Sequence, residues 1–245
     1  MMNHFFKKVV LKVKIEFGYV QKKFDKQILK NEKINKMYIK KFLPSNPVII
    51  DAGANNGSDS IEMTRLYTNK AKIYAFEPLP AIFEELQHNI RRYKNIKAFR
   101  LALSNKNGEQ ELYVSSGASI GSSSLLKPGT HLQDHPDVLF NEKIKVTTIT
   151  LDEWAEQNGI NSVDFLWMDL QGFELEVLKE SKIIFRTVKV VHMEVSTKNT
   201  YEGVTLYPET KLWMENNGFY VDQEAIPKGW DMGNVLFIRK NQGHL

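Results

Sequence analysis

Cysteine is absent from this 245-residue chain, so disulfide scaffolds, thiolate zinc sites and cysteine nucleophiles are all excluded. The sequence also lacks any apolar run approaching the ~20 residues that cross a bilayer, and its first residues lack the apolar stretch and small-residue cleavage site of a secretion signal. These absences are typical of a protein from a reducing compartment. We therefore expect a cytoplasmic protein.

Acidic residues are scarce in the first part of the chain. Residues 1–43 contain twelve lysines and three acids, a balance of +9, whereas the whole chain has a formal net charge of +4. Pro44 and Pro47 then mark a boundary, because proline and the residue before it resist helix. The sequence therefore predicts a basic N-terminal extension, residues 1–44, and one catalytic domain, residues 45–245.

Apolar residues in the extension recur at helical spacing with lysines between them. They are Phe5, Phe6, Val9, Val10, Val13 and Phe17. The pattern predicts a helix with one apolar stripe, and we favour packing of this stripe on the catalytic domain. Peripheral contact of residues 1–43 with an anionic membrane surface is the alternative.

The catalytic domain alternates apolar runs with helical stretches. Strands are predicted at residues 47–51, 71–78, 96–104, 163–170, 187–196, 218–226 and 233–240, and helices at residues 58–67, 80–93, 151–159, 173–181 and 208–217. This order is typical of an α/β fold with parallel strands and helical crossovers. Residues 108–115 and 143–151 predict an added hairpin, and the irregular insertion between them, residues 115–143, is long enough for a functional loop.

The stretch VIIDAGANNGSDS, residues 48–60, places a glycine-rich turn directly after a buried strand. In open parallel sheets, ligands bind at the carboxyl ends of the strands, and glycine admits unusual dihedrals and close ligand approach. The spacing lacks the three glycines of the dinucleotide motif G-x-G-x-x-G, and Asp51 at the strand tip repels phosphate. The turn, with Gly53 and Gly57, therefore favours a cationic, phosphate-free cofactor, unless the glycines only shape a turn.

Glu77 ends the next predicted strand, in the stretch YAFEPLP. A carboxylate at this place can accept hydrogen bonds from both hydroxyls of a ribose. Together with Asp51 it favours S-adenosylmethionine, whose amino and sulfonium groups are positive. The alternative is that Glu77 is a surface carboxylate without a ligand.

A second group of polar residues follows the strand at 163–170, in the stretch DFLWMDLQGFELEVLKES. Asp169 ends that strand, and Gly172 opens another turn into a helix, with Gln171 and Glu174 beside it. Glu194 ends the following strand, so all these side chains are expected at one crevice.

Taken in order, IIDAGANNGSDS, AFEPLP, LALSNKNGEQELYV, GSSSL, VTTITLDEW, DFLWMDLQGFELEVLKES and HMEVS resemble the FkbM-type family of S-adenosylmethionine-dependent methyltransferases. The resemblance spans residues 48–239. It implies a class I methyltransferase (Rossmann-like) fold, with a seven-stranded sheet that is parallel except for a reversed last strand and has helices on both faces. It also implies O-methylation of hydroxyls, commonly on sugars, glycolipids or polyketides.

The same resemblance assigns cofactor contacts by position. The methionine portion falls to Asp51, Gly53, Asn55 and Gly57, the ribose to Glu77, the adenine to the segment from Ala102 to Ser104, and Asp169 lies beside the loop. The family often has a lysine two positions before this aspartate and a glutamate two positions after it. Trp167 and Gln171 stand there instead, which removes two charges from the expected crevice.

Methyl transfer to a sugar hydroxyl needs a base or a metal, because the hydroxyl is scarcely ionised at neutral pH. Asp169 is our first candidate, as base or as ligand of a divalent metal, although aspartate here also suits a helix cap. Glu194, His131 and His135 are the other catalytic candidates. The two histidines lie four residues apart in the insertion, where Pro128 and Pro136 disfavour a long helix, so we expect a lid with one histidine turned inward.

Other side chains have more ordinary interpretations. His192 alternates with apolar neighbours and is expected in the core. Five aromatic residues suit stacking on a sugar face, although buried aromatics usually belong to the core; they are Trp154, Trp167, Tyr201, Trp213 and Trp230.

Three other functions compete with glycan O-methylation. A nicotinamide-dependent oxidoreductase should show phosphate-binding glycines at residues 53–58 and a tyrosine-lysine pair, and neither is visible. A methyltransferase-fold binding protein without turnover would still bind the donor. A nucleic-acid methyltransferase should line its crevice with basic residues, whereas the lysines concentrate in the extension, so we expect no nucleic-acid partner. The expected partner is a small-molecule or glycan acceptor.

Overall fold

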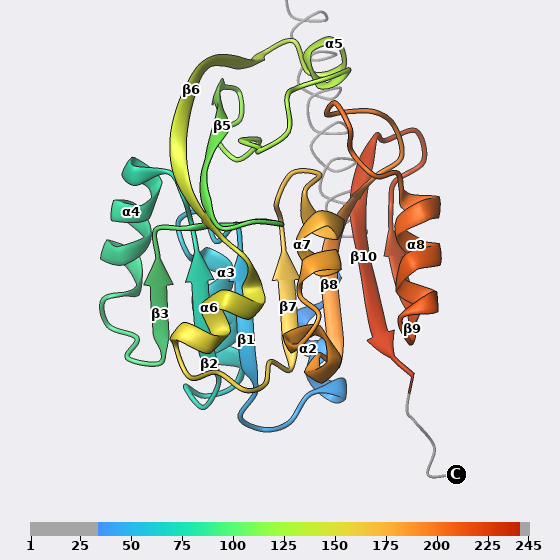
Figure 1. Ribbon diagram of the computed structural model, residues 1–245. Helices are drawn as coiled ribbons and strands as arrows, with labels where there is room; N and C mark the ends of the chain where they lie inside the picture. The colour runs from blue at the N-terminus through green and yellow to red at the C-terminus, as the bar shows by residue number, and fades with distance from the viewer. Residues whose placement is uncertain (1–33, 241–245) are drawn as a thin grey trace, which may run out of the picture.

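The computed structural model of the protein describes residues 34–240. Seven strands form one sheet with helices on both of its faces (Figure 1). In spatial order the strands are β3 (Ile96–Phe99), β2 (Lys72–Phe76), β1 (Val48–Ala52), β7 (Phe165–Met168), β8 (Val190–Ser196), β10 (Met232–Arg239) and β9 (Phe219–Ala225). All neighbouring strands are parallel except for β10, which runs antiparallel to both β8 and β9. The prediction of a parallel sheet with a reversed last strand is confirmed.

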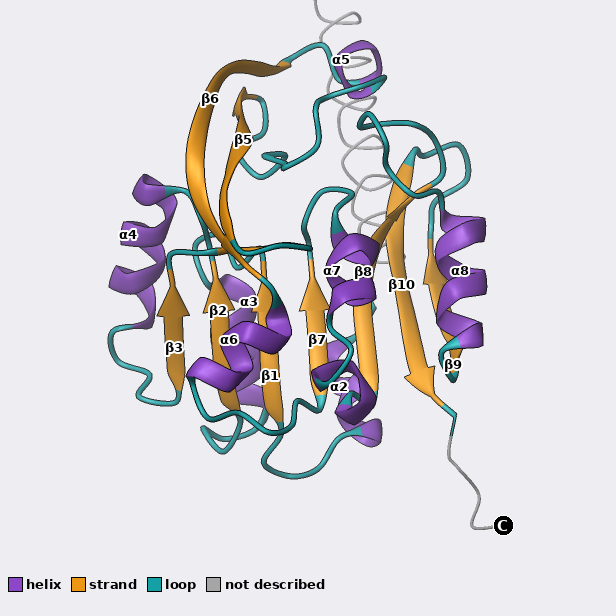
Figure 2. Ribbon diagram, in the orientation of Figure 1, coloured by secondary structure: helices purple, strands orange, loops and turns teal. Residues whose placement is uncertain are grey.

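The central strands are apolar on both faces because helices cover both sides of the sheet. In β1, Ile49 packs into one helix layer and Ile50 into the other, and both are fully buried. One layer holds α3 (Ser58–Leu66) and α4 (Pro80–Ile90), and the other holds α6 (Leu151–Gln157), α7 (Glu174–Glu180) and α8 (Tyr207–Asn216). A short 3-10 helix, η2 (Ile184–Thr187), precedes β8 (Figure 2 colours helices and strands separately).

A second, three-stranded sheet rises above the carboxyl ends of the parallel strands (Figure 1). It contains β4 (Ala102–Leu103), β6 (Val138–Ile149) and β5 (Gly108–Gly117). Since β5 pairs antiparallel with β6, the predicted hairpin is confirmed. Its strands are longer than predicted and use both ends of the insertion, which also contains the short helix α5 (His131–Asp134).

The single strand predicted at residues 96–104 is wrong. The chain pairs with β2 only as far as Phe99, and the residues from Ala102 pair with β6 in the other sheet. The exposed Arg100 lies at the crossing between the two sheets. Two strands that continue one apolar run can thus serve different sheets, which no local pattern reveals.

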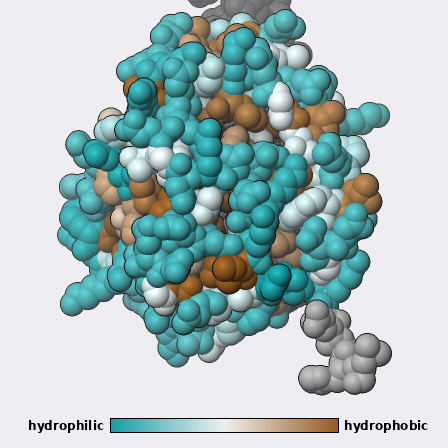
Figure 3. All heavy atoms as spheres, in the orientation of Figure 1, coloured by the Kyte–Doolittle hydropathy of each residue, from teal (hydrophilic) through white to brown (hydrophobic). Residues whose placement is uncertain are grey.

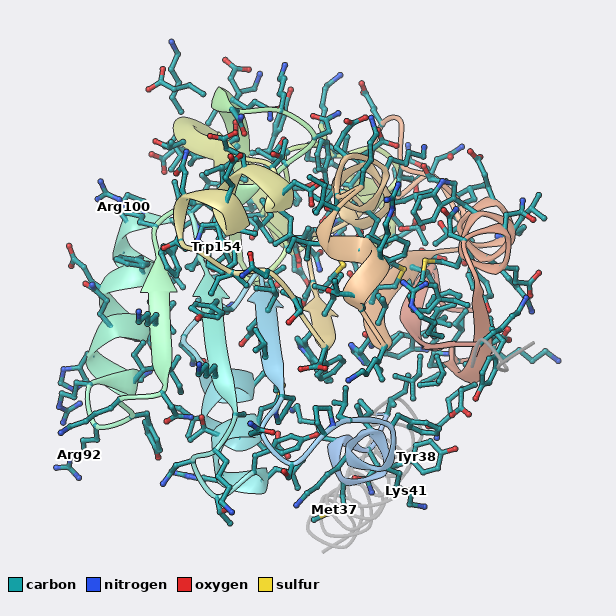
Figure 4. All side chains as sticks on the ribbon, turned by 60° about the horizontal axis from the view of Figure 1, so that its bottom comes forward. Met37, Tyr38, Lys41, Arg92, Arg100 and Trp154 are labelled. Atoms are coloured by element: carbon teal, nitrogen blue, oxygen red, sulfur yellow. The ribbon has the colours of Figure 1, made fainter. Side chains whose placement is uncertain are left out.

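An aromatic cluster fixes α6 on the sheet. The Trp154 ring lies between α6 and the strands (Figure 4), with ring centroids 4.9 Å from Tyr74, 5.0 Å from Phe76 and 5.3 Å from Phe99. Edge-to-face contacts of this kind add to the free energy gained by burial. Trp154 therefore belongs to the core.

Residues 34–43 pack against the layer of α3 and α4. They form α2 (Lys36–Ile39) and the 3-10 helix η1 (Lys40–Phe42), and Ile34 and Ile39 are buried. Figure 4 labels Met37, Tyr38 and Lys41 on this segment. The helix expected around residues 5–17 lies outside the described residues, and the domain boundary after residue 44 stays a prediction.

No helix within residues 34–240 has the length and apolarity needed to span a membrane. The face drawn in Figure 3 is largely hydrophilic, and its hydrophobic areas are separate. Large exposed apolar side chains come from different elements, Met37 from α2 and Leu212 from α8.

Candidate active site

The turn after β1 brings the tips of three neighbouring strands into contact. Gly53 has a left-handed φ of 80°, and a Cβ there would lie 1.9 Å from the carbonyl oxygen of Asp169. The N–H groups of Gly53 and Ala54 donate to the Phe76 carbonyl at 3.0 and 2.8 Å, and the Asp169 N–H donates to the Ala52 carbonyl at 2.9 Å. Glycine is thus required here by the approach of another strand, in addition to any ligand.

Glu77 is held at the tip of β2 by backbone donors. The N–H of Asn55 donates to its Oε2 at 3.0 Å, and the N–H of Leu79 donates to its Oε1 at 2.9 Å. Burial raises the pKa of Glu77 to about 7, although both hydrogen bonds favour the charged form. Each carboxylate oxygen keeps a further lone pair, so Glu77 can still accept a hydrogen bond from a ligand hydroxyl.

A pocket beside this turn, the first pocket, holds about 730 Å³ of empty space, counting its open mouth. Five of the predicted cofactor residues line it: Gly53, Asn55, Glu77, Ala102 and Asp169. Much of the remaining wall is apolar, with Ile82, Leu101, Leu103, Leu112, Leu125 and Phe173. An apolar wall with a few placed polar groups is typical of a small-molecule site, and it suits a flat ring system such as adenine.

Asp51 lies beneath this pocket and does not line it. Ser60 Oγ of α3 donates to Asp51 Oδ2 at 2.5 Å, and Asp51 Oδ1 has no hydrogen-bond partner among the described residues. The side chain is 1% exposed, and this burial raises its pKa to about 7. An unpaired buried carboxyl oxygen is costly and needs either a proton or a ligand group.

Gly57 and Ser104 also lie outside the lining of the first pocket. Gly57 has a φ of 83°, and a Cβ there would lie 2.5 Å from the Leu86 side chain of α4, so it permits close helix packing. Ser104 is fully buried, and its hydroxyl accepts a hydrogen bond from the Gln110 amide of β5. Both residues thus shape the elements around the pocket.

Three carboxylates meet beyond the tips of β7 and β8. Asp169, Glu174 and Glu194 each offer an oxygen, and these oxygens lie within 4.8 Å of one another. Asp169 does not cap α7, since the residue before that helix is Phe173 and it has no side-chain cap. Glu174 instead accepts the Leu170 N–H at 2.6 Å. The helix-cap alternative for Asp169 is therefore wrong, and Glu174 fixes the turn before α7.

Gln171 bridges two of these acids. Its Nε2 donates to Asp169 Oδ1 at 2.6 Å and to Glu194 Oε2 at 2.7 Å. The Tyr201 hydroxyl lies 2.9 Å from Gln171 Oε1 and 2.8 Å from the Ser122 carbonyl, two acceptors for its proton, which fixes the orientation of the amide. Gln171 has a left-handed φ of 53°, a strained conformation for a residue with a side chain.

The acids hold protons more tightly than isolated carboxyls do. Burial raises the pKa of Glu174 to about 8, and burial followed by the charges of Asp169 and Glu174 raises the pKa of Glu194 well above its ordinary value. Burial also raises the pKa of Asp169, against the hydrogen bond from Gln171. Asp169 is exposed to solvent at the open first pocket, although protein surrounds it on its other sides. The cluster can therefore exchange protons near neutral pH.

A second pocket lies on the other side of Glu194 and has about 980 Å³ of empty space, counting its open mouth. Its walls come from the end of β8, the connection between β9 and β10, and the end of α5. They include Asp134, His135, Lys198, Trp230, Asp231 and Asn234. The acid pair thus stands between two pockets, with Asp169 lining the first and Glu194 the second.

The histidines take separate positions. His135 lines the second pocket, while His131 is buried, with ring centroids 4.9 Å from His135 and 5.4 Å from Tyr201. Burial and then His135 lower the pKa of His131. His192 is buried and stacks on Trp167 with centroids 3.7 Å apart, and burial lowers its pKa to about 3.

Trp167 stands where a lysine is frequent in the resembling family, and a lysine from another element lies on its ring. The Lys36 ammonium is 4.6 Å from the Trp167 ring centroid, 2.5 Å from Glu62 and in contact with Asp59. This partly buried cation therefore joins α2 to α3 and β7.

Sequence reasoning missed the apolar wall of the first pocket. Leu101, Leu103 and Leu112 reach it from β4, β5 and the segment before them. The alternation in residues 108–115 was a usable signal, since it places Leu112 on the apolar face of the hairpin.

The strand order, the glycine turn after β1 and the acidic tips of β1 and β2 define a class I methyltransferase. A family model described as the Methyltransferase FkbM domain matches residues 51–221. The chain belongs to this family, and S-adenosylmethionine is its methyl donor. This assignment sets aside the nicotinamide-dependent alternative.

Two relatives have names that state their acceptor chemistry. The 2-O-methyltransferase NoeI of Sinorhizobium fredii is 31% identical over 70% of this chain and 72% of the relative. The hexuronic acid methyltransferase AglP of Haloferax volcanii is 28% identical over 73% of this chain and 69% of the relative. The solved structure of Methyltransferase FkbM from Methylobacillus flagellatus is 15% identical over 79% of this chain and 44% of that chain, with a TM-score of 0.49.

Proposed function

We propose that this protein transfers a methyl group from S-adenosylmethionine to a hydroxyl of a sugar, glycan or glycolipid, and that Asp169 and Glu194 receive the hydroxyl proton. One observation carries the proposal: Gln171 ties together two carboxylates that line different pockets. A donor on one side and an acceptor on the other would meet at this pair. The relatives named for 2-O-methylation and for hexuronic acid methylation support a sugar acceptor.

The residues of the first pocket fit the donor. Glu77 would accept hydrogen bonds from the ribose hydroxyls, and the leucine wall would cover the adenine. Asp169 offers negative charge toward the positive methionine end, and the buried, unpaired Asp51 Oδ1 lies beneath the turn that would hold it. When bound, the donor supplies a methyl group on a positively charged sulfur.

The protein's own task is to orient the acceptor oxygen and take its proton. A carboxylate with a raised pKa is a stronger base than an ordinary surface acid, and burial raises the pKa of both Asp169 and Glu194. Gln171 holds Asp169 and Glu194 at fixed positions, so a hydroxyl between the pockets can give its proton to either acid. Tyr201 keeps the amide in this orientation. Fixed alignment of this kind supplies much of the rate of a displacement reaction.

We infer that no divalent metal lies between Asp169 and Glu194, although these acids and Glu174 each offer an oxygen within 4.8 Å of the others. Hard cations need converging oxygen ligands, whereas both carboxylates turn an oxygen toward the N–H₂ group of Gln171. The amide thus occupies the position between the two acids with donors. We infer that proton removal relies on the carboxylates themselves.

The test is a methyl-transfer assay with labelled S-adenosylmethionine on neutral and acidic glycosides, with and without EDTA. Labelled sugar that persists in EDTA supports the proposal. Donor binding in calorimetry without transfer to any sugar would contradict it and leave a binding protein.

Membrane contact by the lysine-rich extension is also a proposal. Since residues 1–33 lie outside the described part of the chain, it rests on the sequence alone. Sedimentation with anionic and with neutral vesicles, for the full chain and for a chain lacking residues 1–33, tests it. Equal sedimentation of the two chains would contradict it.

A further inference from the structure

The second pocket combines an exposed aromatic ring with an excess of acidic groups. Trp230 is 51% exposed, although tryptophan is highly buried on average. Its backbone is fixed at both ends, because its N–H donates to the Pro227 carbonyl at 3.0 Å and its carbonyl accepts from Thr197 Oγ1 at 3.0 Å. An exposed aromatic face on a hydrogen-bonded backbone is therefore available to a ligand in this pocket.

The charges around this ring are unequal. Among residues 34–240, Lys198 is the one lysine in the lining, and it is paired with Asp231, whose pKa it lowers. Asp134 and Glu194 also line the pocket, and neither forms an ion pair with a lysine or arginine among the described residues, although the charge of Asp134 also acts on Lys198 and His135 lies in the same lining. A ligand carboxylate would thus meet acidic groups and a lysine whose charge is already compensated.

We propose that the second pocket is the acceptor site, and that it selects glycans whose methylated residue carries no carboxylate, with the apolar face of the sugar on Trp230. This inference rests on the proposed function and names its substrate class as neutral or amino sugars. The pyranose C–H face packs on the indole, and its hydroxyls have acceptors in Asp134, Asn234 and Glu194. Glu194 then adjoins the hydroxyl that is methylated.

The discriminating experiment compares matched p-nitrophenyl glycosides that differ only at C6, glucoside against glucuronide and galactoside against galacturonide. Saturation-transfer NMR with S-adenosylhomocysteine present measures binding, and labelled donor measures turnover. We expect the neutral member of each pair to bind about fivefold or more tightly, as uncompensated carboxylate repulsion requires. Equal or tighter binding of the uronide by the wild-type protein would overturn the inference.

Two variants locate the effect. Trp230→Ala should raise KM about tenfold with kcat within about twofold, and Trp230→Phe should restore most of the affinity. Asp231→Asn removes the carboxylate that pairs with Lys198, so the lysine charge can act on a ligand carboxylate. The ratio of neutral-glycoside affinity to uronide affinity should therefore fall. Tyr220→Ala is the matched control, because Tyr220 is a 38% exposed aromatic on β9 outside the pocket. Unchanged KM in Trp230→Ala would overturn the inference.

Binding and turnover separate this inference from the proposed function. If no sugar is methylated, but neutral glycosides bind to the wild-type protein and not to Trp230→Ala, the proposed acceptor site is supported and the proposed reaction is contradicted. If sugars are methylated but the Trp230 and Asp231 variants change neither KM nor the preference for neutral sugars, the proposed reaction is supported and the proposed acceptor site is contradicted.

Discussion

The carbonyl oxygen of Asp169 occupies the place where a side chain on Gly53 would begin. A Cβ on Gly53 would lie 1.9 Å from that oxygen, although the two residues are 116 positions apart in the chain. The contact joins the cofactor turn after β1 to the acid at the tip of β7. Any movement of one therefore moves the other.

Gly53→Ala should lower both stability and donor affinity. A left-handed φ alone costs an alanine about 1–2 kcal/mol, and here the backbone of Asp169 must also shift. Gly203→Ala is the matched control, because Gly203 has a φ of 79° and open space around it. Urea denaturation and donor calorimetry measure both effects. Equal losses in the two variants would contradict the close approach.

Asp169→Asn and Glu194→Gln should each lower kcat about 10²- to 10⁴-fold, the usual contribution of a general base. The folded state should persist, because each change removes charge from a crowded acid cluster. Glu176→Gln is the control, since Glu176 pairs only with Lys179 on the surface of α7. Single-turnover kinetics measure the effect. Full activity in both acid variants would exclude them as bases.

Gln171→Glu should convert the bridge into a fourth carboxylate and raise the pKa values of its neighbours. The rise of kcat/KM with pH should therefore shift to higher pH, and magnesium should stabilise the variant in a thermal melt. The wild-type protein should show no magnesium response, since its amide points donors at both acids. An identical pH profile for the two proteins would contradict the bridging role.

Asp51 should make the ligand-free protein less stable as pH rises. Its pKa is raised by burial from 3.8 to about 7, so the folded state binds a proton that the unfolded state has released. The free energy of unfolding therefore falls between about pH 4 and pH 7, and this one group accounts for at most about 4 kcal/mol of the fall. Asp51→Asn is neutral throughout and keeps an acceptor for Ser60, so its melting temperature should depend less on pH. Equal pH slopes would refute this effect.

Lys36→Met should destabilise the protein by about 1–2 kcal/mol, because this lysine is 12% exposed and contacts Asp59, Glu62 and the Trp167 ring. Lys41→Met is the control. The Lys41 ammonium also lies over a ring, 4.7 Å from the Tyr38 centroid, but Lys41 is exposed (Figure 4 labels both residues). Melting temperatures should fall for Lys36→Met alone. Similar values for both variants would show that the buried contact adds nothing.

The sequence predicts the strands of the sheet well because each strand and the turn after it leave a pattern within a short stretch of residues. Buried parallel strands need continuous apolar runs, and the turns after them need glycine, so β1 and its turn are readable from VIIDAGANNG alone. The acids at strand tips follow from the same rule. This is why Glu77 and Asp169 are correctly expected at one edge of the sheet.

Other parts of the site depend on contacts that no local pattern carries. Trp167 meets His192 only because β7 and β8 are neighbours in register, and Lys36 reaches the same ring from more than a hundred residues away. The lining of the first pocket likewise depends on where the hairpin of β5 and β6 folds back. Ser104 lies between β4 and β5 with its hydroxyl on Gln110, outside the lining of the first pocket, and a place for it near adenine stays a prediction.

The shared amide of Gln171 would link the two proposed ligand sites thermodynamically. A cation that arrives beside Asp169 reduces the proton affinity of that acid, and Glu194 responds because one N–H₂ group serves both. Linkage is reciprocal, so the acceptor must change donor affinity by the same factor. We therefore expect cooperativity between methyl donor and sugar that varies with pH and depends on this one side chain.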